Sequence, residues 1–326
     1  MARHRNPRSK NFGFGNQTEY ATKTALNNHF GNGHYQTVKT HTERARLFYA
    51  WLLEENKIRD IREVTNLLFS NYALYLKTLI EAEEISIATA ANRVSSVNVV
   101  LQIMRGDQKI RIDKIGDALG SKRCYIRRSI PDGMDTSKVH SLHKELIANE
   151  QPRSAAIILL ARATGMRLRE CILADLPRLT REAANNRLNI QDGCKGGRAG
   201  AFAPRWISVT DEIIYALDYA RQVSPASSRN LLAGDETYIQ FLRREVNPSR
   251  RIIKSFGIRG YHELRAAFAC DRYKELVGLP APVFPRPDTT DKPDREKVRA
   301  ARQVISRELG HERLEVVNAY VGSETK

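Results

Sequence analysis

Apolar residues recur at helical spacing through most of this chain, and that periodicity limits the fold more than any other feature. Thr40 and Glu43 have capping-box spacing, and the apolar positions that follow predict a buried helix over 41–56. The same spacing predicts helices over 68–80 and 87–104, separated by short polar joints. The leucine and aromatic residues of these segments are typical of a core. We therefore expect a bundle of three or four helices in the first part of the chain.

The second part of the chain is also mostly helical, with one interruption. Two β-favouring segments, 187–190 and 205–209, flank a glycine-rich stretch and predict a small hairpin. A cluster of prolines between 280 and 293 predicts an irregular loop. Helical spacing predicts helices over 139–148, 153–163, 212–220, 238–244, 264–276 and 298–309. The predicted fold class is mainly α with a small β-hairpin.

The length of 326 residues suggests two domains, and the distribution of charge indicates where they divide. Residues 1–40 carry six Lys or Arg against one acidic residue, with few periodic apolar positions, which predicts a flexible basic arm. Basic residues are also dense between 105 and 128, which suits either a solvated face or a segment that crosses a nucleic-acid backbone. Together with the turn-forming Pro131-Asp132-Gly133, this places a helical domain over 41–128, a linker over 129–137 and a second domain over 138–326.

Composition narrows the class of partner. The net charge is +16 and the pI about 9.8, while 41% hydrophobic residues suffice for ordinary cores. Such a charge indicates a polyanionic partner, and nucleic acid is the leading candidate. The alternative is a basic surface that only keeps the protein soluble. The longest apolar run, 155–161, is too short to cross a membrane, and no apolar stretch follows the basic start, so we expect a cytoplasmic protein without a membrane partner. The four cysteines lack metal-binding spacing, so they are expected to be reduced, and no metal or other cofactor is expected.

Five short motifs follow one another in the second half of the chain. They are Thr164-Gly165-Met166-Arg167-Leu168-Arg169-Glu170, Gly193-Cys194-Lys195-Gly196-Gly197, His262-Glu263-Leu264-Arg265, Leu309-Gly310-His311 and Tyr320. Each alone is ordinary and is usually explained by a helix cap or a surface ion pair. In this order and spacing they resemble the catalytic domain of the tyrosine recombinases, the phage-integrase family.

The resemblance covers about 138–326 by motif and, more loosely, 36–128, which look like the family's helical core-binding domain. It implies a two-domain clamp on double-stranded DNA that cleaves and rejoins strands through a 3′-phosphotyrosine. The roles that it implies are Arg167 as the first catalytic arginine, Lys195 as the hairpin lysine, His262 and Arg265 as the His-x-x-Arg pair, His311 as the second histidine, Tyr320 as the nucleophile and Glu170 as a supporting acidic group. Arg198 is a weaker candidate for the role of Lys195.

Phosphodiester transfer needs these residue types for physical reasons. Guanidinium forks donate to the nonbridging oxygens on which negative charge develops, which suits Arg167 and Arg265. A phenol with a reference pKa of about 10 needs a proton acceptor, and His262 is the expected one. The resemblance implies that Lys195 protonates the leaving 5′ oxygen, and we expect His311 to hydrogen-bond the scissile phosphate.

The expected function is site-specific recombination, with integration or excision of a mobile element by a homotetramer on synapsed DNA. An accessory DNA-bending protein is a further expected partner. Chromosome-dimer resolution, an integron-type integrase and a relaxing topoisomerase remain open within the same chemistry. From a different class, a catalytically inactive DNA-binding architectural or regulatory protein remains open. The chain departs from the family pattern at two places. Arg265 and His311 are 46 positions apart, more than is usual, and the segment after Tyr320 is short, with six residues.

Overall fold

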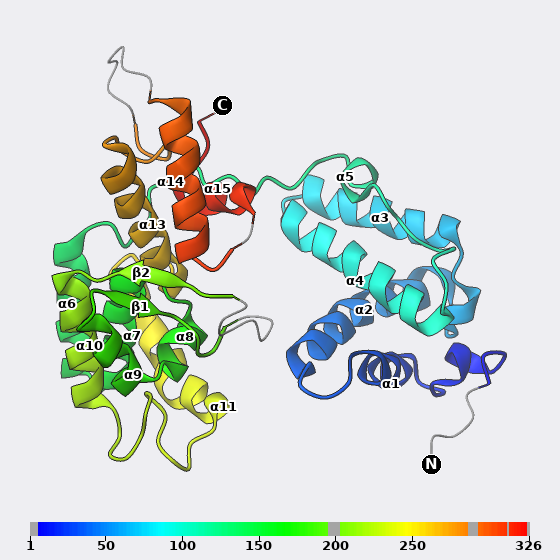
Figure 1. Ribbon diagram of the computed structural model, residues 1–326. Coiled ribbons are helices and arrows are strands. Elements are labelled where there is room, and N and C mark those ends of the chain that lie inside the picture. Colours follow the sequence, from blue (N-terminus) through cyan, green and yellow to red (C-terminus); the bar gives the residue numbers. More distant parts are fainter. Residues whose placement is uncertain (1–5, 195–202, 286–292, 312, 325–326) are drawn as a thin grey trace. The chain divides into compact units, whose positions relative to one another are not determined.

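The structure, a computed structural model, describes residues 6–194, 203–285, 293–311 and 313–324 (Figure 1). The chain forms two compact units, Met1–Cys124 and Tyr125–Lys326. The boundary therefore falls inside the basic stretch 105–128, and the segment 129–137 belongs to the second unit. In the described part of the chain, no helix combines the length and the hydropathy needed to span a membrane.

The first unit is a bundle in which α2 packs against α1 and α4 (Figure 1). Its helices are α1 (Thr18–Phe30), α2 (Tyr35–Asn56), α3 (Asn66–Glu81), α4 (Ile87–Arg105) and α5 (Ile115–Ala118), with 3-10 turns at Lys10–Gly13 and Ile61–Glu63. The helices predicted over 41–56, 68–80 and 87–104 are thus confirmed. Aromatic rings form the centre of the core, where Phe48 and Tyr72 are 4.8 Å apart between ring centroids.

The expectation of a flexible arm over 1–40 is wrong for much of that segment. α1 buries a stripe of small side chains, and α2 already begins at Tyr35. In α1, Ala21, Ala25 and Leu26 are at most 1% exposed because the helix packs against α2 and α4. Alanines give a weak periodic signal, so only the partner helices reveal this face as core.

Hydrogen bonds of Asn11 hold the segment before α1 against the bundle. Asn11 is fully buried and has a φ of 51°, a left-handed conformation that asparagine tolerates better than most residues. Its side chain donates to Gly15 O at 2.8 Å and accepts from Ile61 N at 3.2 Å, while its own N–H donates to Asp60 Oδ1 at 2.9 Å. This network fixes the start of the chain against the turn at Ile61–Glu63.

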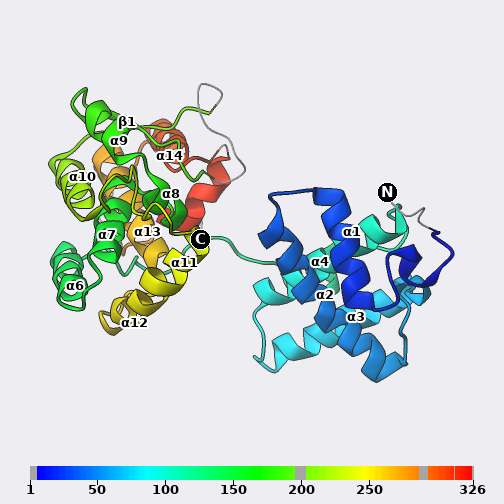
Figure 2. The same ribbon diagram turned by 90° about the horizontal axis from the view of Figure 1, so that it is seen from below.

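The second unit is built around α7 (Pro152–Thr164), in which every residue from 154 to 161 is buried. A helix that is apolar on all sides lies at the centre of a domain, and α7 packs against α6, α10 and α13 (Figure 2). The other elements are α6 (Thr136–Ala148), α8 (Leu168–Leu173), α9 (Leu176–Ala183), β1 (Arg187–Asn189), β2 (Trp206–Ser208), α10 (Asp211–Val223), α11 (Tyr238–Phe241), a π-helical turn (Leu242–Val246), α12 (Asn247–Ser255), α13 (Tyr261–Val277), α14 (Arg295–Glu308), a 3-10 turn (Leu314–Val317) and α15 (Asn318–Val321).

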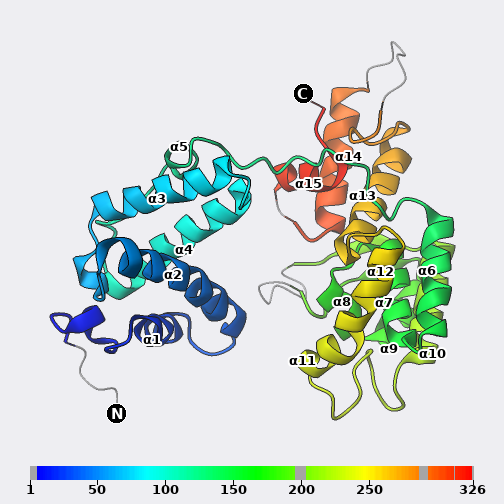
Figure 3. The same ribbon diagram turned by 180° about the vertical axis from the view of Figure 1, so that it is seen from behind.

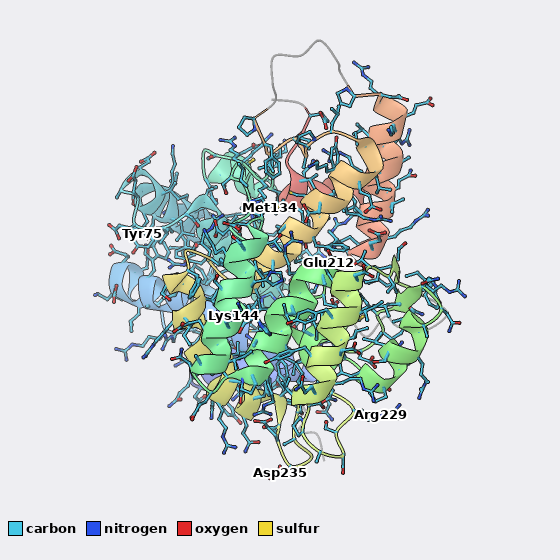
Figure 4. All side chains as sticks on the ribbon, turned by 90° about the vertical axis from the view of Figure 1, so that its left-hand side faces the viewer. Tyr75, Met134, Lys144, Glu212, Arg229 and Asp235 are labelled. Carbon is cyan, nitrogen blue, oxygen red and sulfur yellow. The ribbon has the colours of Figure 1, made fainter. Side chains whose placement is uncertain are left out.

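Outer helices and the hairpin of this unit pack against the core around the central helix α7. α12 lies beside α6 (Figure 3), and Figure 4 looks onto the face formed by α6 and α10, where Lys144 and Glu212 are labelled. The predicted hairpin is confirmed: β1 and β2 are antiparallel, and the pair Leu188 and Ile207 is buried. Part of the proline-rich loop, 286–292, lies outside the described residues.

Candidate active site

The turn between α7 and α8 positions Arg167. Gly165 ends α7 with a φ of 65°, and a Cβ on it would lie 2.5 Å from Phe268 Cδ1, so both the turn and the packing require glycine. Arg167 then occupies the N-cap position of α8. Its N–H donates to Glu170 Oε2 at 2.6 Å, and its Nη1 donates to Glu170 Oε1 at 2.7 Å. Glu170 therefore holds both the backbone and the guanidinium of Arg167.

The C-terminal helices supply the other candidate residues. α13 packs against both α14 and α15 (Figure 1), and their shared core includes Tyr273 and Ile305. α13 carries His262 and Arg265 near its start, and α15 carries Tyr320. His311 follows the end of α14. This packing brings residues together that are up to 153 positions apart in the sequence.

A hydrogen-bonded cluster forms around the hydroxyl of Tyr320. Arg265 Nε donates to Tyr320 Oη at 3.2 Å, and His311 Nε2 lies 3.1 Å from the same oxygen. Arg167 Nη2 and Arg265 Nη2 both lie 3.3 Å from His311 Nε2. Tyr320 itself is only 4% exposed. Four of the residues expected from the sequence are thus in direct contact.

His311 is a neutral base in this cluster. Burial and the charges of Arg265, Arg167 and Arg205 lower its pKa to about 3. Guanidinium groups only donate hydrogen bonds, so the Nε2 atom that faces two of them carries the lone pair. That lone pair is within hydrogen-bond reach of the Tyr320 hydroxyl.

Arg265 is the most buried cation of the site, with 1% exposure. Besides Tyr320, its guanidinium donates to Gly165 O and Leu309 O. Burial, with Arg205 and Arg167 nearby, lowers its pKa to about 10, so it remains charged at neutral pH. Its orientation is therefore set by two backbone turns rather than by solvent.

Glu170 is the buried counter-charge. It is fully buried and accepts from Arg205 Nη1 at 2.6 Å as well as from Arg167. Burial alone would raise the pKa of Glu170, but the Arg205 charge and the Arg167 N–H bring it below its ordinary value. The carboxylate is therefore ionised and offsets part of the charge of three guanidinium groups.

His262 is beside Tyr320 without a hydrogen bond to its hydroxyl among the described residues. Their ring centroids are 5.1 Å apart, whereas the Tyr320 hydroxyl is hydrogen-bonded to Arg265 and His311. Desolvation of its ring and the Arg265 charge lower the pKa of His262. Two histidines therefore flank the tyrosine, and His311 is the one in contact with the oxygen.

Two of the expected site residues lie outside the described part of the chain, and one buried arginine of the site was not expected from the sequence. Lys195 and Arg198 lie outside the described residues. The sequence reading did not single out Arg205, which is 3% exposed and reaches Glu170. A signal was available: side chains two apart share one face of a strand, so Arg205 shares the buried face of Ile207. In the described part of the chain, no group of three or more His, Cys, Asp or Glu could hold a metal ion.

Residues 126–271 match the sequence profile of the family described as Integrase. This part of the chain is therefore similar to that family. The match includes Arg167, Glu170, His262 and Arg265 and ends before His311 and Tyr320, which the tertiary structure adds to the cluster. The resemblance to this family is thereby confirmed for the second unit of the protein.

The solved structures that share the fold of this chain match nearly its whole length. A Tn1549 transposon integrase in complex with circular intermediate DNA (CI6a-DNA) has a TM-score of 0.59 at 14% identity, over 95% of this chain and 96% of that one. A second complex of that integrase (CI5-DNA) has a TM-score of 0.57 at 14% identity, over 93% and 95%. A lambda integrase (75-356) dimer bound to a COC′ core site has 0.56 at 13% identity, over 93% and 94%. These likenesses confirm the predicted fold class, and no curated protein sequence matches.

Proposed function

We propose that this chain is a site-specific tyrosine recombinase that cleaves and rejoins DNA through a 3′-phosphotyrosine at Tyr320. The observation that carries the proposal is the position of one phenol oxygen. Tyr320 Oη lies within hydrogen-bond distance of Arg265 Nε and His311 Nε2, and Arg167 contacts the same histidine. A nucleophile, a neutral base and two fixed cations are the components that phosphoryl transfer to a phenol requires.

The cations account for binding and for stabilising the transition state. A scissile phosphate beside Tyr320 would meet the guanidinium groups of Arg167 and Arg265. Their forks donate to nonbridging oxygens, and their position in a water-poor site strengthens the interaction as charge develops there. One carboxylate, Glu170, faces three arginines, so the site keeps a net positive charge for the phosphate.

The proton movements follow from the same geometry. The Tyr320 oxygen forms a bond to phosphorus as the bond from phosphorus to the 5′ oxygen breaks, and the phenol proton passes to a histidine. His311 is favoured over His262 as that acceptor because its Nε2 is 3.1 Å from Tyr320 Oη and carries a lone pair. Lys195 is proposed to protonate the departing 5′ oxygen. Religation is the reverse, with a 5′ hydroxyl attacking the phosphotyrosine.

Double-stranded DNA is the proposed partner. The net charge of +16 suits it, and the similar structures named above are complexes of integrases with circular intermediate DNA or a core site. We extend the proposal to integration or excision of a mobile element by a homotetramer on synapsed DNA, with an accessory DNA-bending protein.

The test is covalent capture of DNA. The probe is a pool of nicked duplexes with a randomised centre, in which cleavage beside the nick releases a short fragment and leaves the protein attached to a 3′ phosphate. We expect a denaturant-resistant adduct with the native chain and none with Tyr320→Phe. Tyr273→Phe is the matched control, since Tyr273 is buried in the same core and its hydroxyl bonds to Glu324 at 2.6 Å rather than to the cluster.

The two variants and the native chain separate the candidate functions. Binding of duplexes without any adduct from the native chain would favour the catalytically inactive DNA-binding protein. An adduct that persists in Tyr320→Phe would assign the nucleophile to another residue.

A further inference from the structure

We propose that Arg205 is a positioning residue of the active site, which lets Glu170 orient Arg167 without cancelling its charge and holds the turn that carries His311. The inference rests on the proposed function. Arg205 makes no hydrogen bond to Tyr320 in the described structure, so it acts through its neighbours. Its guanidinium donates from Nη1 to Glu170 Oε2 at 2.6 Å, from Nε to Glu308 O at 2.6 Å and from Nη2 to Gly165 O at 3.2 Å.

The first role concerns charge. Glu170 holds Arg167 by two hydrogen bonds, and alone it would neutralise the cation that the phosphate needs. Arg205 donates to Glu170 Oε2, the oxygen that also accepts from the Arg167 N–H, and the side chain of Arg205 is only 4% exposed. Because the pair is buried, its interaction is screened much less than that of an exposed pair. Glu170 can therefore anchor Arg167 while Arg205 supplies the compensating charge.

The second role concerns the end of α14. The last carbonyls of a helix have no donor within the helix, and cations there interact favourably with its dipole. Arg205 takes Glu308 O, and Arg265 takes the next carbonyl, Leu309 O. The chain then turns at Gly310, which has a φ of 63°, and a Cβ there would lie 3.1 Å from Arg205 Cδ. The two arginines thus determine where His311 leaves the helix.

The hairpin in turn fixes Arg205. Its N–H donates to Asn189 Oδ1 at 2.9 Å, and its carbonyl accepts from Ile190 N at 3.0 Å. Gly165 O accepts from Arg205 and also from Arg265. One buried side chain therefore connects the hairpin, the turn before Arg167 and the end of α14.

A double-mutant cycle tests the charge role. The variants are Arg205→Met, Arg205→Lys, Glu170→Gln and the double variant Arg205→Met/Glu170→Gln, each assayed at a temperature at which circular dichroism shows it folded. The readouts are the single-turnover rate of adduct formation and the affinity for the captured duplex. Arg205→Met should lower the rate by about 100-fold, as displacement of a catalytic group by about 1 Å does, with affinity changed by less than about threefold. Arg205→Lys keeps the charge but not the fork, so its rate should be intermediate.

The cycle separates action through Glu170 from an independent effect. In the Glu170→Gln background, Arg205→Met should cost less than about tenfold, because the charge that it offsets is absent. Arg187→Met, the loss of an exposed arginine that stacks on Trp206 in the same hairpin, should leave the rate unchanged. The proposal would be overturned if the rate losses of Arg205→Met and Glu170→Gln simply multiply in the double variant. A native rate of adduct formation in Arg205→Met would also overturn it.

A measurement without DNA keeps this inference separate from the proposed function. The imidazole NMR signals of His311, assigned by their loss in His311→Asn, should shift in Arg205→Met and stay in place in Arg187→Met. An unchanged His311 signal in Arg205→Met would overturn the second role. If the native chain forms no adduct, the proposed function fails, and the NMR result still decides whether Arg205 holds the turn.

Discussion

Replacing Glu170 with glutamine should lower the free energy of unfolding of the second unit by about 3–5 kcal/mol, the usual cost of leaving buried charge without its partner. Glutamine has nearly the same shape, but it removes the carboxylate that lies against Arg167, Arg205 and Arg265. The side chains of Arg205 and Arg265 are at most 4% exposed, so water cannot take its place. Adding Arg205→Met should recover part of the loss, since one of the uncompensated charges is then gone.

The matched control is an ion pair in the same unit whose carboxylate is exposed. Glu275 lies 2.6 Å from Arg272 with 66% of its side chain exposed, and such pairs contribute about 0–1 kcal/mol. Glu275→Gln should therefore change the free energy of unfolding by no more than that. The contrast between Glu170 and Glu275 separates burial from the mere loss of a negative charge.

The assay must report on one unit, because a chain with two units need not unfold in a single transition. The protein has two tryptophans, Trp51 and Trp206, and a Trp51→Phe background leaves only Trp206, in the second unit. Urea titrations followed by its fluorescence at pH 7 give the free energy of unfolding of each variant. The signal comes from the residue next to Arg205, so it also reports on the hairpin.

The pH dependence supplies the refutation. The folded pKa of Glu170 is below its ordinary value of 4.5, so its contribution is present above that value and is lost as pH falls through the folded pKa. The stabilities of the native chain and Glu170→Gln should therefore converge in acid. A difference at pH 7 no larger than that of the Glu275→Gln control, or one that persists unchanged in acid, would refute the reasoning.

Three further predictions concern other parts of the molecule. Asn11→Ala should destabilise the first unit by about 1–3 kcal/mol, because buried groups such as Ile61 N–H lose their partner; Trp51 fluorescence measures this, and a native transition would contradict it. The folded pKa of His311 is about 3, against 6.5 ordinarily, so between pH 7 and 5 only the unfolded state binds this proton, and the free energy of unfolding falls by at most about 2 kcal/mol. In His311→Asn the plot of unfolding free energy against pH should lack this contribution. Equal slopes in the variant and the native chain would argue against the low pKa. Lys195→Ala should form the adduct much more slowly than the native chain on normal DNA. Its rate should recover on a duplex with sulfur in place of the bridging 5′ oxygen, because the departing thiol needs little protonation. The rate of Arg167→Ala should not recover on that duplex, and equal rescue of both variants would assign the general acid to another residue.

Local patterns in the sequence determined most of the secondary structure and selected the residues that we expect at the site. The helix expected over 87–104 is α4, Ile87–Arg105, because helical periodicity records which face of a segment is buried. The hairpin was likewise predictable from its β-favouring residues and intervening glycines. The ordered motifs selected Arg167, His262 and Arg265 among many arginines and histidines, since their chemistry and spacing are written in the chain itself.

Only the tertiary structure decided which of these residues touch. Sequence reasoning assigned the tyrosine proton to His262, whereas the geometry puts His311 Nε2 at the oxygen of Tyr320, a relation set by how α13, α14 and α15 pack. It also missed Arg205, whose partner Glu170 is 35 positions away. It took α1 for part of an arm, because its alanines become core only when α2 and α4 cover them. Periodicity reports what a residue prefers along its own segment, whereas these contacts depend on partners far away in the chain.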